Sequence, residues 1–182
     1  MEESVKREAE QNLMAQGQTE KEPAVQNQMA QEQTEQTELE QQVQANLTEM
    51  LALPKMDVRT YSPLVLAYIG DAVYEILVRT RVVSHGSMQV NKMHKKSASL
   101  VKAETQANLA KLLMDELTPE EASVYRRGRN ARSATMAKHA TMIDYRMATG
   151  FEALMGYLYL MGRYDRVLKL VHDGFEKIGE IE

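Results

Sequence analysis

The sequence has no cysteine, no tryptophan, only two phenylalanines and only four prolines among its 182 residues. Without cysteine, neither a disulfide framework nor a thiolate metal site can form, which favours a reducing compartment. The longest apolar runs are LVLAYIG and LMGYLYLMG, far shorter than the roughly 20 residues that cross a bilayer. The amino-terminal segment is polar and acidic, unlike a secretory signal peptide. We therefore expect a cytoplasmic protein with no membrane partner.

The net charge of −4 is divided unevenly along the chain. Residues 1–50 carry eleven glutamates against three basic residues, a net charge of −8. Residues 51–182 carry nineteen basic against fifteen acidic residues, a net charge of +4. The second part is therefore compatible with a polyanionic partner, although the whole chain is acidic.

The first part has a composition that disfavours folding. Residues 1–46 contain eleven glutamines and no aromatic residue, and the heptapeptide MAQGQTE at 14–20 returns as MAQEQTE at 29–35. Such a segment buries too little apolar surface to offset its chain entropy. We interpret residues 1–50 as a disordered, acidic, Gln-rich extension, with a docking tail as the alternative. Residues 51–182 are then the folded domain.

Helix signals are frequent in the second part. Ser62 followed by Pro63 is an N-cap with proline at the first helical position. Thr118 and Glu121 have the spacing of a capping box, and that helix should end before Gly128. No segment shows a convincing alternation of period two, so no strand is expected. The sequence predicts an all-α helical bundle, with helices near 62–82, 90–101, 107–114, 118–127, 144–161 and 165–178.

Two acidic residues stand alone in strongly apolar helices. Asp71 follows Gly70 in the first helix, and Glu152 lies in the fifth. Helices that are apolar nearly all round are typically buried. An ionised carboxylate is rarely buried without a compensating cation. A glycine in mid-helix costs about 1 kcal/mol relative to alanine, which close approach of a backbone or ligand would compensate.

Each acid alone has an ordinary explanation, such as pairing with an arginine or capping a backbone group. Glu75 illustrates it, since Arg79 stands four residues later on the same helix. Asp71 and Glu152 have no such partner at helical spacing. The pair together therefore predicts convergence on a metal ion.

A basic segment separates the two acids, because residues 122–143 contain no acidic residue and include the run RRGRNARS. Arginine donates two hydrogen bonds at once to phosphate, although such a loop is often only solvated surface. Tyr125 is the only aromatic nearby, and binding of single strands needs aromatic platforms, so a duplex backbone is the better ligand. The candidate RNA-binding residues are Arg126, Arg127, Arg129, Asn130, Arg132, Ser133 and Lys138, with His94 and Lys95 in an earlier cluster.

These blocks resemble the ribonuclease III family. The string YIGDAVYE at 68–75 resembles its first signature, and FEALMGYLYL at 151–160 resembles its second. The run RRGRNARS resembles the loop that precedes the second catalytic helix. The subgroup that the chain resembles most is Mini-ribonuclease III, a short bacterial form without a double-stranded RNA-binding domain.

The resemblance implies the ribonuclease III catalytic fold and a homodimer with two active sites facing one RNA duplex. It implies an endoribonuclease that hydrolyses double-stranded RNA with Mg²⁺, or Mn²⁺ as a substitute, and leaves 5′-phosphate and 3′-hydroxyl ends. Asp71 and Glu152 would be its catalytic, metal-binding residues. The implied substrate is the precursor of the large-subunit (23S) ribosomal RNA, in a bacterial cytoplasm, with a ribosomal protein as a possible assistant.

Two positions depart from the full-length family pattern of four metal-site acids. They fall on Ala67 and Thr149, neither of which carries charge, and Mini-ribonuclease III proteins resemble this chain in that loss. Magnesium often uses one or two carboxylates and completes its shell with water and phosphate oxygens. The alternative is a non-catalytic, ribonuclease III-like RNA-binding protein associated with ribosomes. A helix-turn-helix DNA binder fits less well, because the first and fifth helices lack the polar face of a recognition helix.

Overall fold

The computed structural model describes residues 56–86, 88–132 and 141–181, together with Thr34, Glu38, Gln42, Val43, Ala45, Leu47, Glu49–Ala52 and Pro54. The chain divides into two compact units, Met1–Leu47 and Thr48–Glu182. Most of the extension expected at residues 1–50 lies outside the described residues, so the following account concerns the second unit. The elements described in this unit are all helical, as the sequence predicts.

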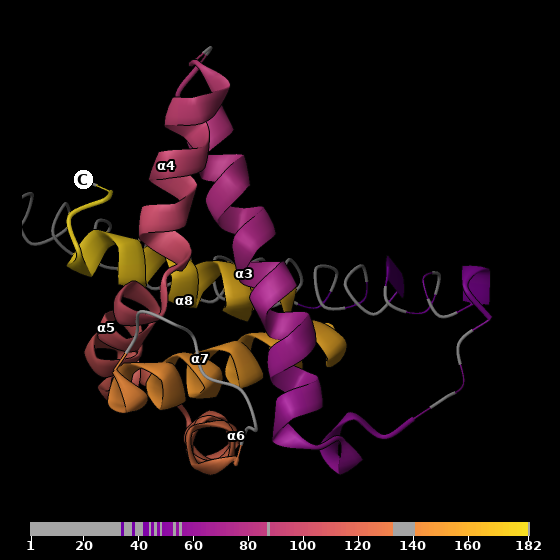
Figure 1. Ribbon diagram of the computed structural model, residues 1–182. Coiled ribbons are helices and arrows are strands. Elements are labelled where there is room, and N and C mark those ends of the chain that lie inside the picture. The colour runs from indigo at the N-terminus through magenta and orange to yellow at the C-terminus, as the bar shows by residue number, and fades with distance from the viewer. Residues whose placement is uncertain are drawn as a thin grey trace, which may run out of the picture. The chain divides into compact units, whose positions relative to one another are not determined.

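Helices follow one another closely from Val58 onward. In chain order they are η1 (Val58–Thr60), α3 (Pro63–Ser84), α4 (Val90–Val101), α5 (Ala103–Leu113), η2 (Met114–Glu116), α6 (Pro119–Asn130), α7 (Met142–Leu160) and α8 (Tyr164–Lys177). Helix α7 is the centre of the unit, since α3, α5, α6 and α8 all contact it (Figure 1). Helices α3 and α4 form a hairpin whose tip projects away from α7 (Figure 1). Among the described residues, none of the helices combines the length and apolar character that crossing a bilayer requires.

Both residues predicted to cap a helix stand at the start of one. The Ser62 hydroxyl accepts a hydrogen bond from the Val65 nitrogen at 3.3 Å, at the start of α3. At the start of α6, the Thr118 hydroxyl accepts from the Glu121 nitrogen at 3.3 Å, and the Thr118 nitrogen donates to Glu121 Oε2 at 2.9 Å. These side chains satisfy backbone groups that a helix end leaves without partners. The two predicted starts are therefore confirmed.

The predicted end of α6 before Gly128 is wrong. The helix continues to Asn130, because Gly128 is a site of close packing rather than a terminator. A Cβ added at Gly128 would lie 2.7 Å from the Ala153 Cβ and 2.9 Å from the Gly150 Cα, both on α7. The glycine therefore lets α6 press against α7. As a consequence, the arginines expected in a loop up to Asn130 lie in the last turns of α6.

The closest helix crossing joins α3 to α7. A Cβ added at Gly70 would collide with the carbonyl oxygen of Glu152 and lie 2.6 Å from the Gly156 nitrogen. On the other helix, a Cβ added at Gly156 would collide with the Leu66 carbonyl oxygen. The mid-helix glycine thus has the close backbone approach that the sequence suggests. It brings residue 71 on α3 next to residue 152 on α7.

Helix α3 is not buried all round, contrary to the expectation from its composition. One face lies in the core, where the Tyr74 ring meets the Phe151 ring edge-on with centroids 5.2 Å apart. The opposite face is open in the single chain: Tyr68 is 83% exposed and Ile76 63% exposed. The α3 helix therefore carries an apolar face that the rest of the described chain leaves uncovered.

Candidate active site

The two solitary acids come together where α3 and α7 cross. Asp71 follows the glycine that touches the Glu152 backbone, so both side chains start from the same crossing. Asp71 is exposed, whereas Glu152 is half-buried. The structure therefore brings the two acids together, and their binding of a metal ion stays a prediction.

Electrostatics at the crossing disfavour two negative charges. Burial, followed by the charge of the neighbouring Asp71, raises the pKa of Glu152 from 4.5 to about 7. Although the Asp71 side chain reaches the surface, partial burial, followed by the charge of Glu75, raises its pKa as well. A cation between the two carboxylates would relieve both effects, because an opposite charge favours the ionised form.

Among the described residues, no lysine, arginine or histidine side chain neutralises either carboxylate. Neither Asp71 nor Glu152 has an ion-pair partner there, whereas Glu75 pairs with Arg79 at 2.6 Å, as the sequence predicts. Carboxylate oxygens are the ligands that Mg²⁺ prefers in proteins, usually one or two of them with several waters. The donor set at the crossing therefore fits a magnesium ion.

The two positions that depart from the family pattern add no further ligand. Ala67 is buried, with 6% of its surface exposed, and its methyl group cannot bind a metal. Thr149 is equally buried, and its hydroxyl donates to the Tyr145 carbonyl oxygen at 3.0 Å. Water and substrate oxygens would have to complete the coordination of any ion at this site.

Sequence reasoning missed one polar residue at the site. Gln106, on α5, is 2% exposed, and its side chain lies near enough to Glu152 for its amide to lower the pKa of that carboxyl. The only available signal was a glutamine on the apolar face of α5, alongside Ala107 and Leu109. Such a residue is easily taken for an ordinary helix former, because glutamine has good helix propensity.

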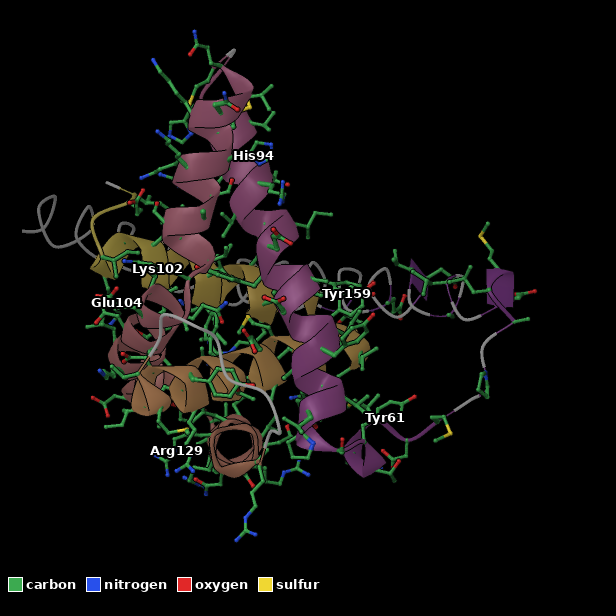
Figure 2. The ribbon with its side chains drawn as sticks, in the orientation of Figure 1. Tyr61, His94, Lys102, Glu104, Arg129 and Tyr159 are labelled. Carbon is green, nitrogen blue, oxygen red and sulfur yellow. The ribbon has the colours of Figure 1, made fainter. Side chains whose placement is uncertain are left out.

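The predicted RNA-binding residues fall on two elements. Arg126, Arg127, Arg129, Asn130 and Arg132 are exposed at the end of α6 and just beyond it. Arg129 Nε donates to Asn130 Oδ1 at 3.4 Å, and in the described ranges none of these arginines forms an ion pair. Figure 2 shows Arg129 on α6, near the foot of the view, and His94 high on the α4 arm. His94 and Lys95 are exposed there, while Ser133 and Lys138 lie outside the described residues.

A second group of possible metal ligands lies on α8 and is already engaged. His172, Asp173 and Glu176 stand close together at the surface. Lys169 Nζ lies 2.6 Å from Asp173 Oδ2, so a protein cation neutralises that carboxylate. This cluster therefore resembles an ordinary solvated helix face.

Known proteins share both the sequence and the fold of the second unit. Residues 64–163 match the family model described as Ribonuclease III domain. Mini-ribonuclease 3 of Clostridium tetani is 47% identical over 132 residues, which cover 70% of this chain and 87% of that protein. Mini-ribonuclease 3 of a Thermoanaerobacter species is 42% identical over 142 residues, covering 78% of this chain and 100% of that protein.

A solved structure agrees with the sequence relationship. The crystal structure of a Fusobacterium nucleatum protein matches with a TM-score of 0.63 and 28% sequence identity. The match covers 70% of this chain and 100% of that one. The all-helical arrangement around α7 therefore occurs in an independently determined structure.

Proposed function

The chain belongs to the ribonuclease III family, among the Mini-ribonuclease III proteins, and from that membership we propose a specific reaction and substrate. Membership makes it an endoribonuclease of double-stranded RNA. We propose that it hydrolyses phosphodiester bonds with Mg²⁺ held at Asp71 and Glu152, leaving 5′-phosphate and 3′-hydroxyl ends. The single observation that carries the proposal is a pair of neighbouring carboxylates at the α3–α7 crossing, neither of which forms an ion pair with a described residue.

The two carboxylates would hold the ion, and their charge state matters. A bound Mg²⁺ supplies Lewis-acid chemistry, lowering the pKa of a water and offsetting charge on phosphate oxygens. Glu152, with a pKa near 7 in the free protein, must give up its proton for the ion to bind. Mn²⁺ offers the same charge and similar oxygen ligands, so it should substitute.

The exposed arginines at the end of α6 would bind the duplex backbone. Arg126, Arg127, Arg129 and Arg132 present guanidinium groups without ion-pair partners in the described part of the chain, and Asn130 adds a short amide. Such groups read the shape of A-form RNA through phosphates and 2′-hydroxyls. Ser133, Lys138, His94 and Lys95 are proposed to extend this contact.

We propose that the enzyme is a homodimer whose interface includes the open face of α3. Val65, Tyr68 and Ile76 are 48%, 83% and 63% exposed, and their spacing places them along one side of the helix. An apolar stripe of this kind rarely faces solvent in a monomer. A second copy would cover it with the same stripe, which is the self-complementary contact of a two-fold dimer.

The proposed substrate in a bacterial cytoplasm is the precursor of 23S ribosomal RNA, with a ribosomal protein as a possible partner. The resemblance to Mini-ribonuclease III supports this assignment. A non-catalytic, ribosome-associated RNA-binding protein is the competing function, since two of the four family acids are absent at Ala67 and Thr149.

One incubation separates the two functions. The full chain is mixed with a long RNA duplex in two parallel samples. One contains about 5–10 mM Mg²⁺ and the other a chelator, because such hydrolysis needs the metal. A nuclease shortens the duplex only with the metal, and end-labelling should detect 5′-phosphates. A duplex that is shifted on a native gel but never shortened would support the binding protein instead. Single-stranded RNA of the same sequence is the matched control.

A further inference from the structure

We propose that Gln106 is a positioning residue of this metal site: its buried side-chain amide fixes the Glu152 carboxylate in the orientation that a divalent cation needs. The inference rests on the proposed function, because it assigns a new role within the same site. Three observations carry it: the burial of Gln106, the position of its nitrogen between Val101 and Glu152, and an oxygen without a partner among the described residues.

One hydrogen bond holds the Gln106 side chain in the core. It is 2% exposed, and Nε2 donates a hydrogen bond to the Val101 carbonyl oxygen at 3.0 Å. Helix α5 packs against α7, and there the same amide lies near the Glu152 side chain, whose pKa it lowers. An amide nitrogen carries two protons, so one can hold the side chain in place while the other orients the carboxylate.

The other end of the amide gains nothing from its position. Gln106 Oε1 is buried and has no hydrogen-bond partner among the described residues. A buried acceptor without a partner lowers the stability of the fold. Leucine or methionine would fill the same space without that cost. A buried polar group that lowers stability and makes no compensating structural contact is characteristic of functional sites.

The ion needs such a fixed ligand here more than in a site with four acids. Among the described residues, Asp71 and Glu152 are the carboxylates at the crossing without an ion pair, since Glu75 pairs with Arg79, and the Thr149 hydroxyl is committed to the Tyr145 carbonyl. Magnesium demands near-ideal octahedral geometry, so a wandering glutamate would bind it poorly. Groups that orient a metal ligand commonly raise the affinity for the metal by roughly 10–100-fold.

The test compares metal binding and stability in the full chain without RNA. Electron paramagnetic resonance of free Mn²⁺ gives the dissociation constant, and thermal unfolding of the metal-free protein gives Tm. In Gln106→Met and Gln106→Leu, Mn²⁺ binding should weaken by about tenfold or more, whereas Tm should stay equal or rise. Asn108→Ala, an exposed change on the same helix, should alter neither quantity.

The possible results are distinguishable. If Gln106→Met binds Mn²⁺ as tightly as the natural chain, or loses binding together with Tm, the positioning role is wrong. Asp71→Asn separates this failure from that of the proposed function. Equal Mn²⁺ binding by the natural chain and Asp71→Asn would mean that the metal site itself is misplaced. Weak binding by Asp71→Asn alone would refute only the role of Gln106.

Discussion

At the residue scale, the site is a pair of carboxylates that the fold holds in an unfavourable electrostatic state. Glu152 is half-buried beside Asp71, and no lysine, arginine or histidine of the described residues pairs with either. Among the described residues, the Gln106 amide is the only group that lowers the Glu152 pKa, and burial outweighs it. The free protein thus stores a repulsion that a divalent cation would remove.

This repulsion should appear in the pH dependence of folding. The raised pKa of Glu152, about 7 against an ordinary 4.5, means that the folded chain holds this proton more tightly than the unfolded chain. Its contribution to stability is therefore present at pH below 4.5 and is lost as pH rises through 7. Glu152→Gln should match the natural chain near pH 4 and exceed it at pH 8, by up to about 3 kcal/mol.

The measurement is chemical denaturation of both proteins across this pH range in the presence of a chelator. The exposed Glu176→Gln on α8 is the matched control and should show no such divergence. A constant difference between Glu152→Gln and the natural chain at all pH values would contradict the assigned protonation. Addition of Mg²⁺ at pH 8 should stabilise the natural chain more than Glu152→Gln.

At the element scale, the crossing of α3 and α7 determines where the two acids stand. We expect Gly70→Ala to push the helices apart, because the new methyl would collide with the Glu152 carbonyl oxygen and lie 2.6 Å from the Gly156 nitrogen. Overpacking of this kind costs about 1–3 kcal/mol. Tm and cleavage rate should both fall, although the substitution is favourable for an isolated helix.

Asn108→Ala, an exposed change on α5, serves as the control for Gly70→Ala. It should leave both Tm and the cleavage rate near their natural values, since surface substitutions usually change stability by less than about 0.5 kcal/mol. An unchanged cleavage rate in Gly70→Ala would show that the crossing does not set the catalytic geometry.

A second element-scale prediction concerns the buried ion pair between α6 and α8. Glu121 is 2% exposed, and Arg166 donates to both of its oxygens, at 2.8 and 2.9 Å. Arg166→Met should cost about 3–5 kcal/mol in unfolding free energy, because it leaves a buried charge unpaired. Lys169→Met, which removes the surface pair with Asp173, should cost less than about 1 kcal/mol. Equal losses in the two variants would contradict the burial of Glu121.

The sequence predicted helix boundaries well where the signal lies within a few residues of the helix end. Ser62 and Thr118 marked helix starts, because a capping side chain acts on backbone groups only a few residues away. The start of α5 was placed too late, at Ala107 instead of Ala103, since Lys102 supplies no side-chain cap. Gly128 was misread as an end, because its role depends on α7, which is distant in sequence.

The same distinction separates the predicted parts of the site from the missed part. Asp71 and Glu152 were identifiable because each is a charge in an apolar helix. Gln106 was not, because its partner Glu152 lies 46 positions later and an uncharged glutamine on a helix attracts no attention. The open face of α3 was also missed, since composition shows that a helix is apolar but not what covers it.

At the scale of the whole molecule, the uncovered α3 face gives a prediction about assembly. Tyr68→Glu should convert the proposed dimer to a monomer, because it places a charge in an apolar two-fold contact. Sedimentation velocity in the micromolar range measures the change. Leu168→Glu, an exposed apolar position on α8, is the control and should leave the mass unchanged. A natural chain that sediments as a monomer would contradict the dimer.

The division of charge between the two parts of the chain also belongs to this scale. The net +4 of residues 51–182 coincides with the exposed arginines of α6, which suits a polyanion, whereas residues 1–50 carry a net −8. Duplex binding through phosphates should weaken steeply with salt, as counterion release requires. Substrate binding is thus assigned to the arginines of α6 and catalysis to Asp71 and Glu152, within one helical unit.

The most direct test of the central claim is the separation of RNA binding from cleavage in Asp71→Asn. This change removes one charge of the proposed metal site and keeps the size of the side chain. With Mg²⁺, the variant should bind a long RNA duplex with nearly natural affinity and cleave it at least about a thousandfold more slowly, the scale typical of losing a metal ligand. Asp115→Asn, an exposed position in η2, should cleave normally. Natural cleavage rates in Asp71→Asn would contradict the account.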